Sequence, residues 1–190
     1  YIGFDNQIHQ QNGVQYHNIT GWDNYRSQMP LLALIAPNAA ADVAQSLVND
    51  AKQDRGGGLP RWEHVNTNSG GMVGDPQPTA IASVFAFGAR TFDVAGALAA
   101  ADHGATDPSA STGGHAVREG LSDYLAKGYV GSETDSYSAS ATLEYATSDF
   151  AIAQLAVDIQ ERSGASAVKL AETKLREAQV SLKTYEEREG

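Results

Sequence analysis

The sequence contains no cysteine and no long hydrophobic run. Without cysteine, the chain cannot form a disulfide framework, a zinc ribbon, an iron–sulfur cluster or a catalytic thiolate, although this absence assigns no cellular compartment. The longest apolar stretch runs from Leu31 to Pro37, whereas a membrane-spanning helix needs about 20 residues. We therefore expect no membrane insertion.

Basic residues are also scarce. The 190 residues include 13 Lys and Arg but 23 Asp and Glu, which gives a formal net charge of −10. A protein with this excess of negative charge binds phosphate backbones and anionic lipid poorly, so we expect no nucleic-acid partner. A hydrophobic content of 42% with 19% charged residues is typical of a folded chain rather than a disordered one.

Several common catalytic motifs are missing. The sequence has no glycine-rich phosphate-binding motif, no nucleophile elbow of the serine hydrolases and no paired-histidine motif of the zinc proteases. Its five histidines are scattered over segments that we expect to be loops. For each of them we favour a surface or hydrogen-bonded role over metal ligation.

Charge density divides the chain near Gly164. Residues 1–164 hold 8 basic and 18 acidic residues, whereas residues 165–190 hold 5 of each in a much shorter stretch. We therefore predict two regions, 1–164 and 165–190, that join at Ser163 and Gly164. The chain begins at Tyr1 without a signal-peptide pattern, so we expect an internal or processed segment whose targeting signal lay upstream.

The first region has helical periodicity and few strand-like alternations. Asn38 and Asp93 are suited to cap helices, and apolar residues recur at spacings of three and four. The pattern predicts helices over residues 39–54, 78–88, 94–101, 116–126 and 139–162, with a loop over 104–114. In the last helix the expected buried stripe is Leu143, Ala146, Phe150, Ala153 and Val157. The expected fold is mainly α, with helix pairs joined by glycine-rich loops.

The second region carries a heptad stripe. Its apolar residues repeat at spacings of three and four, at Val168, Ala171, Leu175, Ala178, Leu182 and Tyr185, and charged residues lie between them. The stripe covers fewer than three heptads. It therefore suits either a short coiled coil or an amphipathic helix that packs on its own protein.

Aromatic and charged residues gather just before an apolar helix. Asp23 and Arg26 are three residues apart and can form a helical ion pair worth roughly a few tenths of a kcal/mol. With Trp22 they also suit a sugar site, in which the indole stacks on a pyranose ring and the charged groups bind hydroxyls. Trp62 and Asp75 repeat this chemistry at later junctions between loop and helix.

Glu144 lies among apolar residues of the long helix expected over 139–162. Burial there would raise the pKa of its carboxyl group and suit it to general-acid catalysis. Together with the residues around Trp22, it suits either a carbohydrate site or a scatter of structural residues. The residue types alone leave both interpretations open.

Six blocks of sequence occur in a specific order and spacing. They are YIGFD (1–5) with His9, GWDNYR (21–26), PLL (30–32), LPRW (59–62), MVGD (72–75), and TLEYA (142–146) with Asp149 and AIAQL (151–155). In this order they resemble the catalytic domain of glycoside hydrolase family 92, whose members are calcium-dependent exo-α-mannosidases that invert the anomeric centre. The resemblance covers residues 1 to about 163 and implies part of an (α/α)6 barrel without its later helices.

The resemblance implies that Glu144 is the general acid. It would protonate the glycosidic oxygen while a carboxylate on the opposite face of the sugar activates water. The base and the calcium ligands are expected outside this segment. Calcium would help to distort the mannose ring and to position the water.

The resemblance also implies a substrate and its contacts. It places Trp22 and Asp23 at the sugar, with Arg26, Trp62 and Asp75 in the wall of the site or behind it. The expected ligand is a mannose-containing oligosaccharide or the N-glycan of a glycoprotein, and the expected location is secreted, periplasmic or at the cell surface. The remaining part of the barrel is expected on the same chain or on a companion chain.

Two features depart from the family pattern. The family has a proline soon after a Gly-Tyr pair, where this chain has Gly128-Tyr129-Val130-Gly131, and residues 165–190 replace an aromatic helix that leads into the rest of the barrel. A second hypothesis is therefore a non-catalytic helical module that binds carbohydrate or another protein. Two aspartates downstream of this segment would favour the enzyme, whereas helicity of a 165–190 peptide that rises with concentration would favour the module.

Overall fold

The computed structural model describes residues 1–163, 173–176, 178–180 and 182–183. This part of the chain is mainly helical. Its helices are α1 (Gly21–Asn24), α2 (Gln28–Ile35), α3 (Pro37–Gln53), α4 (Gln77–Ala86), α5 (Val94–Thr106), α6 (Leu121–Lys127) and α7 (Ser138–Ser163). Short strands form two antiparallel hairpins, β1 (Glu63–His64) with β2 (Thr67–Asn68) and β3 (Ser111–Thr112) with β4 (His115–Ala116).

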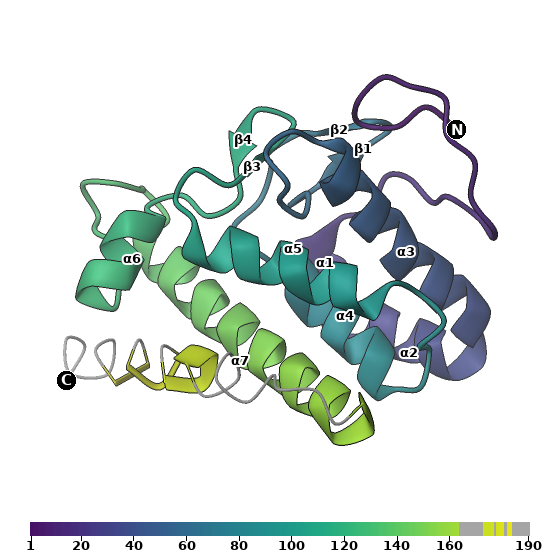
Figure 1. Ribbon diagram of the computed structural model, residues 1–190. Coiled ribbons are helices and arrows are strands. Elements are labelled where there is room, and N and C mark those ends of the chain that lie inside the picture. Colours follow the sequence, from purple (N-terminus) through teal and green to yellow (C-terminus); the bar gives the residue numbers. More distant parts are fainter. Residues whose placement is uncertain (164–172, 177, 181, 184–190) are drawn as a thin grey trace.

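Helix α4 lies at the centre of the helical packing. It contacts α1, α2, α3, α5 and α7, and α7 packs along it (Figure 1). Ile81, Val84 and Phe85 of α4 are buried in the main core. The same core is rich in alanine, including Ala44 of α3 and Ala101 of α5. Because alanine side chains are small, they allow neighbouring helices to approach closely.

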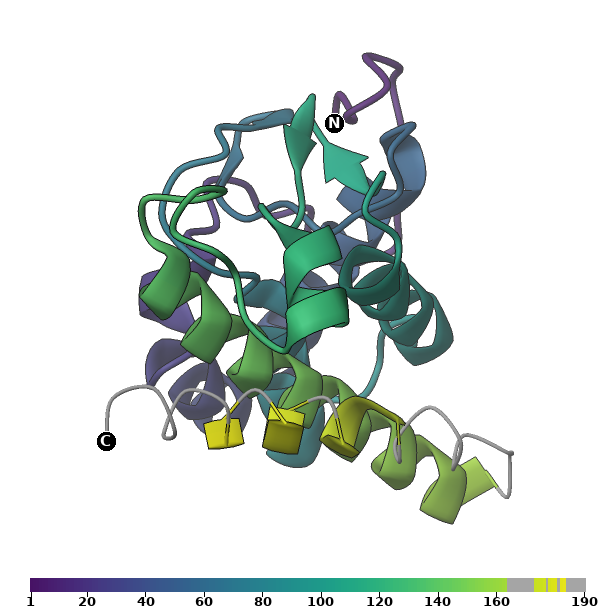
Figure 2. The ribbon, with the colours of Figure 1, turned by 90° about the vertical axis from the view of Figure 1, so that its left-hand side faces the viewer.

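Both hairpins lie at one end of the helices, at the top of Figures 1 and 2. The buried side chain of Asn68 joins them, because its Nδ2 donates to the carbonyl oxygen of Thr112 at 3.2 Å. The Asn68 Oδ1 accepts from the backbone N–H of Trp62 at 3.1 Å. This amide therefore fixes the chain around Trp62 against the second hairpin.

Four of the five predicted helices are confirmed, with changed ends. Helix α3 begins at Pro37, so the predicted cap Asn38 lies inside its first turn. Pro is favoured at that first position because it has no N–H to leave unpaired. Asp93 caps α5 as predicted and accepts from the N–H of Gly96 at 2.9 Å. Helix α5 then continues to Thr106, into the segment predicted to be a loop.

The helix predicted over 116–126 is wrong in its first half. Residues 115–116 form strand β4, and α6 begins only at Leu121. Gly120 has a φ of 66°, in the left-handed region, which breaks a helix at that point. Arg118 turns its side chain into the core instead. The sequence pattern missed this because it treated residues 116–120 as the first turn of an amphipathic helix.

The stripe predicted on α7 is partly wrong. Ala146 and Ala153 are buried, but Phe150 is 51% exposed. The helix is buried over more than one face, because Tyr145 packs in a second core cluster and Ile152 packs in the main core. A single stripe with spacings of three and four cannot describe a helix with this burial pattern.

Half of the predicted heptad stripe falls outside the described residues; of the other half, Ala178 is buried, whereas Leu175 and Leu182 are 37% and 48% exposed. Val168, Ala171 and Tyr185 lie outside the described residues, as does the proposed joint at Gly164. The described residues between 173 and 183 are helical. Lys174 is buried, with its Nζ 3.9 Å from Asp149 Oδ1. The division into two regions stays a prediction.

Apolar side chains of α2 face outward. Leu31, Leu34 and Ile35 are 56%, 62% and 72% exposed.

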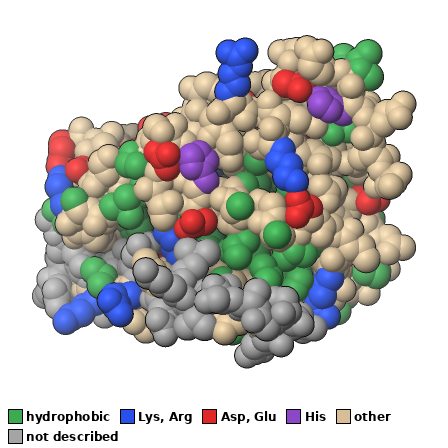
Figure 3. All heavy atoms as spheres, viewed as in Figure 1, with side chains coloured by type: hydrophobic (Ala, Val, Ile, Leu, Met, Phe, Trp, Pro, Cys, Tyr) green, Lys and Arg blue, Asp and Glu red, His purple; other side chains and the backbone are tan. Residues whose placement is uncertain are grey.

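On the face shown in Figure 3, acidic and basic side chains are scattered rather than gathered into one charged patch. Among the described residues, no helix combines the length and apolar character needed to cross a bilayer.

Candidate active site

The carboxylate of Glu144 receives three side-chain hydrogen bonds from one short segment. Trp22 Nε1 and an Arg26 Nη each donate to its Oε1 at 3.0 Å, and the Tyr25 hydroxyl donates to its Oε2 at 3.0 Å. Glu144 belongs to α7, whereas the donors lie in and just after α1. We call Trp22, Tyr25, Arg26 and Glu144 the Glu144 cluster.

The spacing of the three donors explains why they converge. Trp22, Tyr25 and Arg26 are related as i, i+3 and i+4, which places them on one face of a helical turn. The Arg26 guanidinium lies 5.0 Å from the centre of the Trp22 ring and 4.8 Å from that of Tyr25, within the range of cation–π attraction. The donors therefore support one another as well as Glu144.

Tyr25 remains a neutral donor in this setting. Burial raises the pKa of its hydroxyl to about 12, and the adjacent carboxylate of Glu144 contributes to the rise. The Glu144 side chain is 15% exposed, whereas Arg26 is 50% exposed. The cluster thus presents one accessible cation above a carboxylate that is largely covered.

Two glycines allow the segments of the cluster to meet. A Cβ atom at Gly74 would lie 2.5 Å from the Cβ of Glu144, and Gly74 has a φ of +86°. A Cβ at Gly21 would lie 2.4 Å from the Cγ of Pro76. Both positions therefore exclude larger residues. The glycines in the GWDNYR and MVGD blocks bring α1 and the 72–75 loop against α7 and α4.

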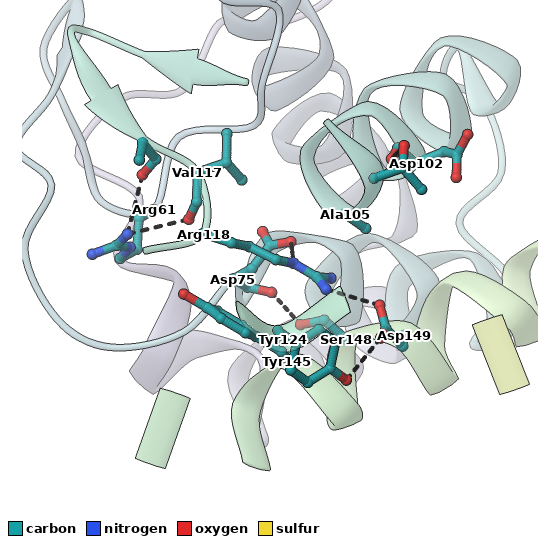
Figure 4. A network of polar contacts seen from close by, with 12 residues as sticks. Arg61, Asp75, Asp102, Ala105, Val117, Arg118, Tyr124, Tyr145, Ser148 and Asp149 are labelled. Carbon is teal, nitrogen blue, oxygen red and sulfur yellow. Dashed lines mark hydrogen bonds and ion pairs between the residues drawn. The ribbon is translucent and has the colours of Figure 1, made fainter. Parts of the chain in front are cut away.

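Figure 4 shows a buried ionic network around Arg118 that includes Asp75, the residue after Gly74. Arg118 donates from Nε to Asp75 and from Nη1 to Asp149, both at 2.9 Å. The Tyr124 hydroxyl donates to the other Asp149 oxygen at 2.9 Å. The side chains of Arg118 and Asp149 are fully buried. Since Asp75 follows Gly74 directly, this network fixes the loop that packs on Glu144 to helix α7.

The network keeps Arg118 charged. Burial by itself lowers the pKa of its guanidinium, but Asp149 and Asp75 raise it further than burial lowers it. The guanidinium also lies 5.0 Å from the centre of the Tyr145 ring. Ser148, one turn along α7, donates to the backbone oxygen of Asp75. Asp75 is thus held by hydrogen bonds at both its side chain, from Arg118, and its backbone oxygen, from Ser148.

The structure brings only some of the predicted site residues together. Trp22, Arg26 and Glu144 are in direct contact, whereas Asp75 is buried and bound to Arg118. Asp23 is exposed and forms no ion pair among the described residues, so the predicted pair with Arg26 is absent there. Arg26 pairs with Glu144 instead.

Trp62 lies beside the cluster rather than in it. Its backbone pairs with that of Thr20, the residue before α1. Its ring packs next to Gly71, where an added Cβ would lie 3.3 Å from the indole. Trp62 therefore lies beside the Glu144 cluster, in the surface formed by the start of the β1–β2 hairpin and the 70–74 loop.

A calcium site is not found in this part of the chain. Among the described residues, no group of three or more His, Asp or Glu side chains is placed to hold a metal ion. Glu144 is paired with Arg26, and Asp75 and Asp149 are paired with Arg118. The described residues thus do not fit a calcium ion.

Comparison with known proteins identifies the family. The model of the glycosyl hydrolase family 92 catalytic domain matches residues 1–174. The chain belongs to this family. A search of curated proteins gave no match.

Solved structures of family 92 enzymes resemble the chain. The α-mannosidase BT3965 from Bacteroides thetaiotaomicron, solved with mannoimidazole, is 25% identical over 95% of this chain, with a TM-score of 0.81. The inverting mannosidase BT2199 from the same organism is 27% identical over 94%, with a TM-score of 0.75. This chain spans 22% of each of those chains. Its mainly α fold is therefore part of an (α/α)6 barrel.

Sequence reasoning missed several residues that shape the site. Tyr25 was quoted only as part of a block, although its spacing from Trp22 and Arg26 marks it as a third donor on the same face. Arg118 was not among the predicted site residues and lay only within the helix predicted over 116–126. Its pairing with Asp75 and Asp149 depends on contacts across 43 and 31 residues, which no local pattern can reveal.

Proposed function

We propose that this chain supplies the general-acid side of the active site of an inverting exo-α-mannosidase, with Glu144 as the acid. One observation carries the proposal: both carboxylate oxygens of Glu144 are bound by donors from the GWDNYR block, in a chain that belongs to family 92. A partly buried carboxyl group beside an exposed cation and an aromatic ring is suited to protonating the glycosidic oxygen of a bound sugar.

The proposed reaction has a simple proton balance. Glu144 first takes up a proton from solvent as Arg26 leaves Oε1; it then gives this proton to the glycosidic oxygen, and the C1–O bond breaks with its electron pair moving to that oxygen. Water adds to C1 from the opposite face and loses a proton to a carboxylate base, which inverts the anomeric centre. We place the base outside this chain, so we expect no release of mannose by the 190-residue chain alone.

The hydrogen bonds of Glu144 suggest how the substrate enters. Trp22 and Tyr25 are both partly buried, and they hold the carboxyl group in a fixed orientation. Arg26 is the most exposed of the three donors and bonds to Oε1. We infer that the glycosidic oxygen takes the place of Arg26 at Oε1. The guanidinium then moves to a neighbouring sugar hydroxyl.

We assign the sugar contacts to three further residues. Asp23 is exposed beside Trp22 and free to accept from hydroxyls, and Trp62 forms part of the adjacent wall. Asp75 is proposed to act from behind the site, through the loop that holds Gly74 against Glu144. Terminal α-mannosides of oligosaccharides or N-glycans are the proposed substrates. Calcium bound elsewhere in the domain and a location outside the cytoplasm are part of the same proposal.

Tryptophan fluorescence tests the proposed site directly. The chain has only two tryptophans, Trp22 and Trp62, so a sugar bound at the cluster should change the emission. We expect methyl α-mannoside to do so in the intact chain, and Asp23→Asn to weaken binding. The matched change Asp158→Asn on α7 should leave binding unaltered. Equal binding of glucosides, or no binding of mannosides, would contradict the proposal.

A further inference from the structure

Lys174 is buried, and its ammonium group reaches the ionic network around Arg118. Its Nζ donates to the carbonyl oxygen of Ala105 in α5 at 3.4 Å and lies 3.9 Å from Oδ1 of Asp149 in α7. The side chains of Lys174 and Asp149 are both fully buried. A buried ammonium group is destabilising unless a carboxylate and hydrogen-bond acceptors surround it. Lys174 therefore belongs to the network, although it lies in the region predicted to be separate from residues 1–164.

Lys174 balances the charge of the network. Within the part of the chain that the structure describes, Arg118 and Lys174 are the cations at ion-pair distance from its carboxylates, Asp75 and Asp149. Arg61 acts on Asp75 from a longer range and donates instead to backbone carbonyl oxygens. Without Lys174, one guanidinium would face two buried carboxylates. Such an excess of buried charge is strongly destabilising, because water cannot screen it.

Asp75 connects this network to the Glu144 cluster. It follows Gly74, where an added Cβ would lie 2.5 Å from the Cβ of Glu144. Burial raises the pKa of the Asp75 carboxyl group, so a shortage of cations would favour its protonated form. Protonation would weaken the hydrogen bond that Asp75 accepts from Arg118 at 2.9 Å. The loop that packs on Glu144 would then be held less firmly.

We propose that Lys174 is a positioning residue for the carboxyl group of Glu144. It acts through Asp149, Arg118 and Asp75, which link its ammonium group to the loop against Glu144. The inference rests on the proposed function for its catalytic meaning. A misplacement of about 1 Å can lower a rate by about 10²-fold. In a catalytic domain that includes the remaining barrel, Lys174→Met should therefore lower kcat by up to that order and change KM little.

The fluorescence of Trp22 in the full 190-residue chain tests the inference without any substrate. Trp62→Phe leaves Trp22 as the only tryptophan, and the indole of Trp22 donates to Oε1 of Glu144. In this background, Lys174→Met removes the charge and keeps a long side chain. The emission maximum of the folded chain should shift to longer wavelength, because the indole loses its carboxylate partner and meets more water.

A second substitution that restores the charge balance separates positioning from a general loss of stability. Adding Asp149→Asn to Lys174→Met leaves one cation, Arg118, with one carboxylate, Asp75. The emission maximum should then return toward that of the chain with Trp62→Phe alone. If Lys174→Met does not fold, the double variant decides: emission of the unaltered kind supports the inference, and an unfolded or shifted spectrum overturns it.

Two matched controls complete the experiment. Arg176→Met removes an exposed cation two residues from Lys174 and should leave the emission unchanged. Leu47→Ala, at a fully buried position of α3, should lower stability without shifting the emission of the folded chain. No shift in Lys174→Met, a shift that Asp149→Asn does not reverse, or an equal shift in either control would overturn the inference and leave the proposed function standing. Failure of Glu144 as the acid would instead appear in catalysis and leave the emission result intact.

Discussion

The indole Nε1 of Trp22 donates to Oε1 of Glu144 at 3.0 Å, across a separation of 122 residues. This contact joins the start of the chain to its longest helix. It depends on Gly74, whose backbone approaches Glu144 too closely for any side chain. The geometry of the site is thus decided by a hydrogen bond and by the absence of a Cβ atom.

Replacing Gly74 should therefore disturb the cluster. In Gly74→Ala, the left-handed backbone costs about 1–2 kcal/mol, and the new methyl group displaces Glu144 from Trp22. Gly114→Ala is the matched control, because Gly114 has a φ of +81° but nothing within 4 Å of an added Cβ. Both variants should lose stability, Gly74→Ala more because of its clash with Glu144, and only Gly74→Ala should alter tryptophan emission and mannoside binding. Equal effects would show that the contact with Glu144 is unimportant.

Much of the fold was predictable because it depends on local patterns. Asp93 caps α5, and the pattern of small and apolar residues in α3, α4 and α7 located these helices within a few positions. Residues 116–120 were mispredicted because Arg118 takes part in a buried network that no local pattern encodes. Phe150 was mispredicted because α7 is buried on more than one face.

The site was predictable to a similar extent. The block resemblance selected Trp22, Arg26 and Glu144, which the structure brings into contact. It placed Asp23 at the sugar and Asp75 in the wall of the site or behind it, but it could not reveal that Asp75 is buried against Arg118, because that pair joins residues 43 positions apart. Their different roles follow from tertiary contacts alone.

Removing the charge of Arg118 should destabilise the fold strongly. Arg118→Met leaves Asp75 buried without a cation within ion-pair distance among the described residues, and breaking a buried pair in this way costs about 3–5 kcal/mol. Chemical denaturation measures the loss. The double change Arg118→Met with Asp75→Asn should recover part of it. A small loss in the single variant, or no recovery in the double one, would contradict this role.

Asp50 should make stability depend on pH. It is fully buried in α3, with Oδ1 accepting from Gln15 at 3.2 Å and Oδ2 unpaired among the described residues. Burial raises its pKa to about 8, and the nearby carboxylate of Glu63 adds to the rise. Since the folded chain holds this proton more tightly than the unfolded chain, Asp50 reduces stability as pH rises from about 4 to about 8.

Asp50→Asn removes this dependence. The variant should gain stability relative to the unaltered chain between pH 5 and 8, by at most about 1.4 kcal/mol per pH unit. Denaturation midpoints at several pH values measure the difference. Asp42→Asn, on a less buried part of the same helix, is the matched control. A difference that stays constant from pH 5 to 8 would contradict the assignment to Asp50.

The outward face of α2 should cause self-association. Leu31, Leu34 and Ile35 together expose an apolar surface, and such patches seldom remain uncovered on monomers. Leu31→Glu with Ile35→Lys should reduce association. The helix should remain, because the introduced carboxylate and ammonium groups form a favourable i, i+4 pair. Sedimentation velocity measures the effect, and Ile8→Lys, at an exposed residue elsewhere, is the control. A monomer at all concentrations before substitution would refute the prediction.

The role of Glu144 is the central claim, and leaving-group dependence tests it most directly. The measurement compares Glu144→Gln with the unaltered residue in a catalytic domain that includes the remaining barrel, using an α-mannobioside and a dinitrophenyl α-mannoside. A general acid contributes about 10²–10⁴-fold, so kcat/KM for the mannobioside should fall by that order. The activated substrate needs little protonation and should lose far less, while Glu133→Gln changes neither. Equal losses on both substrates, or full activity on the mannobioside, would contradict the assignment of Glu144 as the acid.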